Sequence, residues 1–99
     1  MEKENWITIG KVGVDSGTLM IGDPCYLTGS KWSNKKYNKY ISGELCKPGK
    51  KFIEIEDGMS VAFESGFGDG VYEVKALIKD YNTWGKRIKE VRIILIEDE

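Results

Sequence analysis

The chain has 99 residues, of which 40% are apolar and 31% charged, and its formal net charge is −1. This length fits one domain over residues 1–99, and the composition is that of a folded chain. Histidine is absent, which excludes Ser-His-Asp and Cys-His catalysis and the usual neutral-pH proton shuttle.

The two cysteines, Cys25 and Cys46, cannot supply the four ligands of a usual structural zinc site. A small secreted domain would usually carry more cysteines as disulfides, so we expect neither residue to form one. Residues 1–5 lack the apolar stretch of a secretory signal, and no apolar run is long enough to cross a bilayer. We therefore predict a cytoplasmic protein with no metal, no cofactor and no membrane partner.

The first half of the chain predicts two strands and one helix. Residues 6–14 and 18–22 are rich in apolar side chains and predict two strands. Asp15-Ser16-Gly17 between them has the composition of a three-residue hairpin loop. Asp23-Pro24 ends the second strand. Residues 33–42 are the helix candidate, with Ser33 as N-cap and Gly43 just after the end, and a coil remains the alternative. Pro48-Gly49 is typical of a type II turn.

The second half predicts four further strands. Residues 52–56 and 59–63 flank Asp57-Gly58, a strong signal for a two-residue hairpin turn. The side chains expected in the core are Ile53, Ile55, Met59, Val61 and Phe63.

A glycine-rich loop at residues 66–70 leads into a strand over residues 71–79. The last strand, residues 86–96, is apolar on both faces near its end and is placed centrally. Its alternation slips between Ile88 and Val91, which predicts a bulge. The fold class is therefore mainly β (all-β or α+β), with about six antiparallel strands in a small barrel or sandwich and one short helix near residues 33–42. The pattern does not choose between barrel and sandwich.

Two stretches of the chain have distinctive motifs. Residues 15–26 have the pattern D-S-G-x-L-x-I-x-D-P-C-Y, preceded by Val14, and residues 66–74 have the pattern G-x-G-D-G-x-Y-x-V. Both stretches resemble those of a family of small bacterial and phage proteins of unknown function. Together they cover about a fifth of the chain. The resemblance implies a bacterial or phage origin and assigns no catalytic residue.

Three segments are candidate sites, each with a structural alternative. Asp23-Pro24-Cys25-Tyr26 places a carboxylate, a thiol and a phenol at a strand end, but an Asx turn with a buried cysteine accounts for the same residues. The glycine-rich loop at residues 66–70 resembles a loop that binds phosphate, but it precedes a strand and not a helix. The structural alternative is a loop that only connects two strands, with its glycines in the left-handed backbone conformation. Convergence of Asp15, Asp23 and Asp69 on one rim would allow Mg²⁺ or Ca²⁺ to bind.

The third segment lies within residues 31–51, which hold seven lysines against one acid, whereas residues 54–73 hold six acids and no base. This asymmetry predicts a dipolar surface. Lysines early in the proposed helix oppose its dipole unless an anion binds there, and nearby aromatic rings suit a base; a solvated lysine face is the alternative. The ligand-binding candidates are Asp23, Tyr26, Trp32, Lys35, Lys36, Lys39, Tyr40 and Asp69.

These features predict a non-enzymatic binding module for a small anionic or nucleotide-like ligand, such as a phage counter-defence or regulatory protein. A nucleic acid is compatible with the lysines but not favoured. The first alternative is a protein-interaction module whose acidic face docks a host or partner protein. The second is a hydrolase that uses Asp23 or Asp69 as base and Cys25 as nucleophile, which would need a strongly raised carboxylate pKa.

Overall fold

The computed structural model describes residues 5–27 and 32–98 and is mainly β. Six strands form two three-stranded antiparallel sheets, and they do not close into a barrel, so the arrangement is closer to a sandwich. The strands are β1 (Trp6–Val14), β2 (Thr18–Gly22), β3 (Phe52–Ile55), β4 (Ser60–Glu64), β5 (Gly70–Asp80) and β6 (Lys86–Ile93). The helical segments are α1 (Pro24–Leu27), α2 (Asn34–Lys36) continued by the π-helix η2 (Tyr37–Glu44), and the 3₁₀ turn η3 (Asn82–Trp84).

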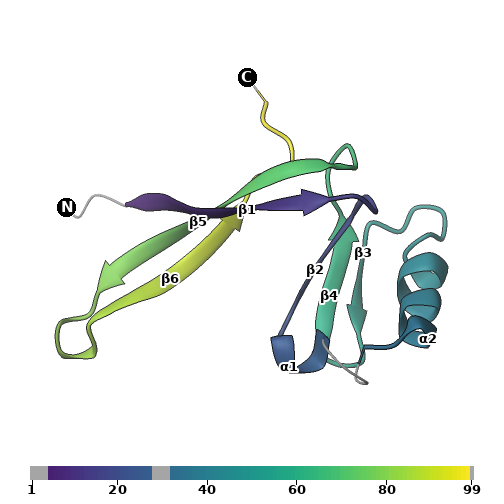
Figure 1. Ribbon diagram of the computed structural model, residues 1–99, viewed down its shortest axis with the longest axis horizontal. Helices are drawn as coiled ribbons and strands as arrows, with labels where there is room; N and C mark the ends of the chain where they lie inside the picture. The colour runs from purple at the N-terminus through teal and green to yellow at the C-terminus, as the bar shows by residue number, and fades with distance from the viewer. Residues whose placement is uncertain (1–4, 28–31, 99) are drawn as a thin grey trace.

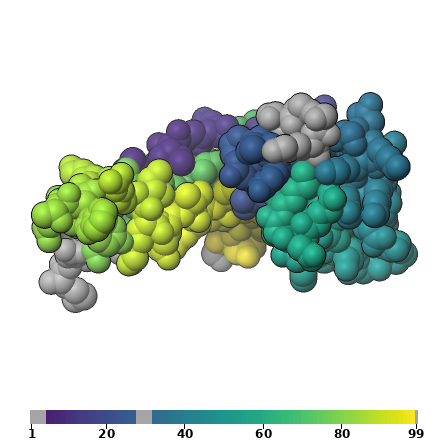
Figure 2. Space-filling view, turned by 90° about the horizontal axis from the view of Figure 1, so that it is seen from below, coloured from purple at the N-terminus to yellow at the C-terminus, as the bar shows by residue number. Residues whose placement is uncertain are grey.

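The first sheet has the strand order β1-β5-β6 and the second sheet the order β2-β4-β3. In Figure 1 the strands of the first sheet run across the view and those of the second run down it, so the sheets diverge from a shared corner. The molecule measures 46 × 37 × 20 Å. Figure 2 shows the same elongation, with the lime-coloured β5–β6 end at one extremity and the teal helical segment at the other.

The segment Asp15-Ser16-Gly17 is a corner and not the predicted hairpin loop. β1 pairs with β5 and β2 pairs with β4, whereas β1 and β2 do not pair with each other. The Ser65 N–H donates to the Gly17 carbonyl at 3.0 Å, which continues the β2–β4 pairing to the corner. A three-residue link can either reverse the chain into a hairpin or turn it toward another sheet. Here β1 pairs with β5 and β2 pairs with β4, so the link turns the chain from one sheet to the other.

The β3–β4 hairpin has the predicted register, but its turn is longer. Met59 packs against the core as predicted, whereas Val61 and Phe63 belong to the other face of β4. Ile55 pairs with Ser60, and the Met59 N–H donates to the Ile55 carbonyl at 3.0 Å across a four-residue loop. Directly opposed residues in a sheet point to the same face. With Ile53 and Ile55 inside, the core residues of β4 are therefore Ser60 and Ala62, while Val61 faces out at 42% exposed.

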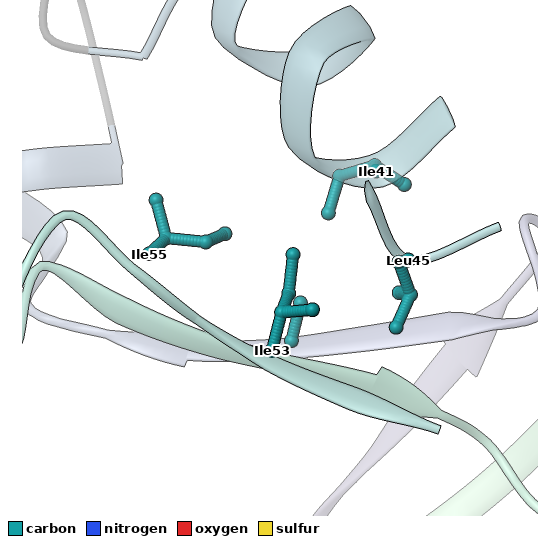
Figure 3. Packing of buried hydrophobic residues seen from close by; sticks show 5 residues of the cluster. Ile41, Leu45, Ile53 and Ile55 are labelled. Atoms are coloured by element: carbon teal, nitrogen blue, oxygen red, sulfur yellow. The ribbon is translucent and has the colours of Figure 1, made fainter. Parts of the chain in front are cut away.

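The core lies between the second sheet and the helix. Ile41 and Leu45 of the helical segment pack onto Ile53, Ile55 and Ala62 of β3 and β4 (Figure 3). Ser33 is the N-cap as predicted, since its hydroxyl accepts from the Lys36 N–H at 3.3 Å. The helix ends later than predicted, because Gly43 lies within η2 and the Leu45 N–H donates to the Tyr40 carbonyl.

β6 is an edge strand, and the central position predicted for it is wrong; β5 is central. The apolar run at residues 93–96 leaves the strand after Ile93 and passes the glycine-rich loop, where the Leu95 carbonyl oxygen approaches Gly66. The predicted bulge is confirmed by a register shift next to Ile88. The type II turn is also confirmed, since the Lys50 N–H donates to the Lys47 carbonyl and Gly49 has a φ of 79°. No helix among the described residues has the length and hydrophobicity to span a bilayer.

Candidate functional site

The sequence-predicted site residues do not form one site. Tyr26 and Lys36 line a hollow of about 390 Å³ together with Glu56, Asp57 and Met59. The Lys36 ammonium lies 3.1 Å from the Glu56 carboxylate. Since two carboxylates face one lysine here, this hollow is a poor place for an anion.

Lys39 and Tyr40 belong to a different hollow. The Lys39 ammonium lies 5.1 Å from the centre of the Tyr40 ring, and Glu44 and Glu54 line the same space. Trp32 and Tyr40 pack against the core cluster, and Lys35 is exposed. Trp32 and Tyr40, the rings proposed to stack on a base, are therefore partly buried against the core.

Asp23 and Asp69 lie at opposite ends of the second sheet. Asp23 follows the end of β2, whereas Asp69 lies beside Gly17 just before β2 begins. Five residues of strand separate the two ends by about 17 Å. Among the described residues no three acids or cysteines are grouped as a metal site, so the convergence of Asp15, Asp23 and Asp69 is not found.

The loop after β2 is the Asx turn that was the structural alternative. The Asp23 carboxylate accepts from the Cys25 N–H at 2.8 Å, and Pro24 starts the single turn α1. Cys25 is exposed and not the buried hydrophobe of that alternative. The hydrogen bond explains the Asp23 carboxylate as part of the turn, so its position is not evidence that it acts as a general base.

Lys36, one of the lysines at the helix start, is likewise engaged by the chain itself. The Ser33 hydroxyl accepts from the Lys36 backbone N–H, and the Lys36 side chain reaches Glu56. A second ion pair joins Lys51 to Glu64 at 3.4 Å. Because both pairs link the lysine-rich segment to the acidic segment, the predicted separation of charge is partly neutralised.

A third hollow brings both sequence motifs together. Three loops surround about 480 Å³ at the corner between the sheets: the β1–β2 corner, the turn after η2 and the loop between β4 and β5. We call it the glycine-loop hollow. Its lining includes Ser16, Gly17, Thr18, Leu45, Cys46, Lys47, Pro48, Gly49, Lys50, Lys51, Glu64, Gly66, Phe67 and Gly68.

The lining of the glycine-loop hollow is positively charged on balance. Lys47, Lys50 and Lys51 stand against the single acid Glu64, whereas the hollows around Lys36 and Lys39 contain as many acids as lysines or more. Lys50 makes no ion pair within residues 5–27 and 32–98, while Lys47 is paired with Glu44 at 3.2 Å. Lys50 is therefore the cation best placed to bind an added anion.

Phe67 provides an aromatic surface beside these lysines. It is 91% exposed, which is costly for a ring of this size unless something else covers it. Flanking glycines with positive φ, Gly66 and Gly68, hold it at the loop tip.

Hydrogen bonds within the loop hold its shape. The Ser65 hydroxyl donates to the Gly68 carbonyl at 2.8 Å, and the Gly68 N–H donates back to the Ser65 carbonyl at 3.0 Å. The Tyr72 hydroxyl contacts the same two carbonyl oxygens. The loop is therefore preorganised, so binding a ligand there does not require it to be ordered first.

Lys50 and Phe67 were not among the predicted site residues. Both lie in segments singled out from the sequence, but nothing in the chain order indicates that residues 47–51 meet residues 66–68. The available signal was a lysine-rich Pro-Gly turn and a glycine-flanked phenylalanine. Comparison of the chain with protein-family models, curated proteins and solved structures found no match.

Proposed function

We propose that the protein is a non-enzymatic binding module for a small anionic, nucleotide-like ligand, held in the glycine-loop hollow. The observation that carries this proposal is that the exposed ring of Phe67 and the lysine-rich turn at residues 47–51 line the same space. An aromatic face stacks on a base, and lysines neutralise phosphate. Glycines at the rim allow the backbone to approach the ligand closely.

The two alternatives have less support at their predicted positions. The acidic docking face loses charge because Glu56 and Glu64 are paired with lysines. For a hydrolase, the Asp23 carboxylate accepts from the Cys25 N–H within a turn, and Asp69 lies at the opposite end of β2 from Cys25. A protein-interaction role has separate support from the apolar face of the first sheet.

The test is ligand binding by the full chain, measured as a thermal shift and by calorimetry. The probes are inorganic pyrophosphate, AMP, ADP and GDP, each at low and at high NaCl. Lys50→Gln is expected to weaken binding of every probe by about three- to tenfold and to reduce its salt dependence. Phe67→Ala is expected to weaken binding of the nucleotides but not that of pyrophosphate.

Matched controls lie outside the glycine-loop hollow. Lys35→Gln removes an exposed lysine of the predicted helix site, and Phe52→Ala removes a phenylalanine that is 68% exposed on β3. Both should bind like wild type. The proposal is wrong if no probe binds at millimolar concentration, or if Lys35→Gln weakens binding as much as Lys50→Gln.

A further inference from the structure

One face of the first sheet is apolar over nearly its whole length. Ile7, Ala76 and Val91 are aligned across β1, β5 and β6, and Ile78 is paired with Ile88 one step further along. Cross-strand partners share a face. Among the paired residues that the structure describes on this face, the charges are at its end, where Asp80 is paired with Lys86.

The opposite face of the same sheet is polar. There Thr8, Lys75 and Arg92 form one row, and Lys11 is paired with Glu73. Such alternation is typical of an antiparallel sheet with one face in water and the other against a core. The sequence is thus patterned for burial of the apolar face.

On the two edge strands that apolar face is open to solvent, whereas Ala76 at its centre is 0% exposed. Ile7 is 45% exposed, Ile88 57% and Val91 58%. The helical segment packs on the second sheet instead, and the two sheets diverge (Figure 1). A three-stranded sheet needs a packed hydrophobic face to be stable, and this chain alone leaves the edge-strand residues of that face uncovered.

The chain as a whole exposes more surface than a compact protein of its mass. A compact protein of 11.2 kDa is expected to expose about 5,700 Å², whereas this chain exposes 7751 Å². The excess of roughly 2,000 Å² is larger than the approximately 800 Å² per partner that a standard interface buries. The radius of gyration, 16.1 Å, also exceeds the approximately 13 Å of a compact chain of this length.

We propose that a second copy of this chain covers the face, so that two β1-β5-β6 sheets pack against each other in a homodimer. A face without internal charge is typical of obligate homodimers, whereas the interfaces of transient complexes are about as polar as the rest of the surface. The first sheet needs its cover in order to fold, and a second copy is the one partner present wherever the chain is made. The proposal is independent of the ligand site, because the face and the glycine-loop hollow share no residue.

The experiment measures the mass of the full chain in solution between 1 and 200 μM by sedimentation velocity and light scattering. We expect about 22 kDa, twice the chain mass, and a melting temperature that rises with protein concentration. Ile88→Lys should weaken association by at least about tenfold. Ile21→Lys is the matched control, because Ile21 is 59% exposed on the edge strand of the other sheet, and it should remain dimeric.

The proposal is overturned if the wild type is monomeric at 200 μM with a cooperative, concentration-independent melt. That result would mean that the apolar face is covered within one chain or is kept for another protein. It is also overturned if Ile21→Lys dissociates while Ile88→Lys does not. If Ile88→Lys fails to fold, the mass of the wild type and the concentration dependence of its melting temperature still show whether the chain is a dimer.

Discussion

The guanidinium carbon of Arg92 lies 4.1 Å from the centre of the Trp6 ring, on the polar face of the first sheet. Trp6 is on β1 and Arg92 on β6, so their contact spans the central strand β5. Leu77 of β5 is paired with Trp6 and is only 5% exposed. On this polar face Arg92 thus covers Trp6 beside the buried Leu77, whereas Ile7, Ile88 and Val91 on the opposite face are exposed.

Removing this contact should destabilise the first sheet. Arg92→Ala is expected to lower the free energy of unfolding by about 0.5–2 kcal/mol, because it removes a cation–π contact and the aliphatic stem that packs with it. Arg87→Ala is the control, since Arg87 is exposed on the same face of the same strand. Urea denaturation followed by circular dichroism measures both. Equal effects of the two substitutions would show that the Trp6 contact contributes nothing specific.

Two buried serines should respond to the same substitution in opposite directions. The Ser60 hydroxyl has no hydrogen-bond partner among the described residues, whereas the Ser65 hydroxyl donates to the Gly68 carbonyl at 2.8 Å. Ser60→Ala should therefore leave stability unchanged or raise it by up to about 1 kcal/mol, and Ser65→Ala should lower it by about 0.5–1.5 kcal/mol. Thermal melts of the two variants compare them directly. A loss in Ser60→Ala as large as that in Ser65→Ala would contradict this account.

Gly66 should tolerate alanine much less well than Gly49. Both have positive φ, 64° and 79°, so both substitutions introduce backbone strain of about 1 kcal/mol. A Cβ on Gly66 would also lie 2.8 Å from the Leu95 carbonyl oxygen, whereas one on Gly49 meets nothing within 4 Å. Gly66→Ala should cost about 2–4 kcal/mol in total, measured by urea denaturation. If the two variants are equally stable, residues 95–96 do not pack on the loop.

Much of the fold was predictable because it depends on local pattern. Alternation of side chains placed β1 and β2 at their observed bounds, and the loss of alternation after Ile88 located the bulge in β6. Ser33 as N-cap and the turn at Pro48-Gly49 follow from the conformations that these residues prefer. The exposed position of Val61 was missed and that of Cys25 was left open, because burial depends on what lies opposite each side chain.

The sequence by itself determined the mainly β class, the strand positions and the register of the β3–β4 hairpin, since each of these depends on neighbours within a few residues. The tertiary structure alone decided that Asp15-Ser16-Gly17 redirects the chain, that Lys36 meets Glu56, and that Lys50 and Phe67 share a hollow. These relationships join residues far apart in the chain, and their free energy comes from long-range pairing and packing, on which local pattern carries no information.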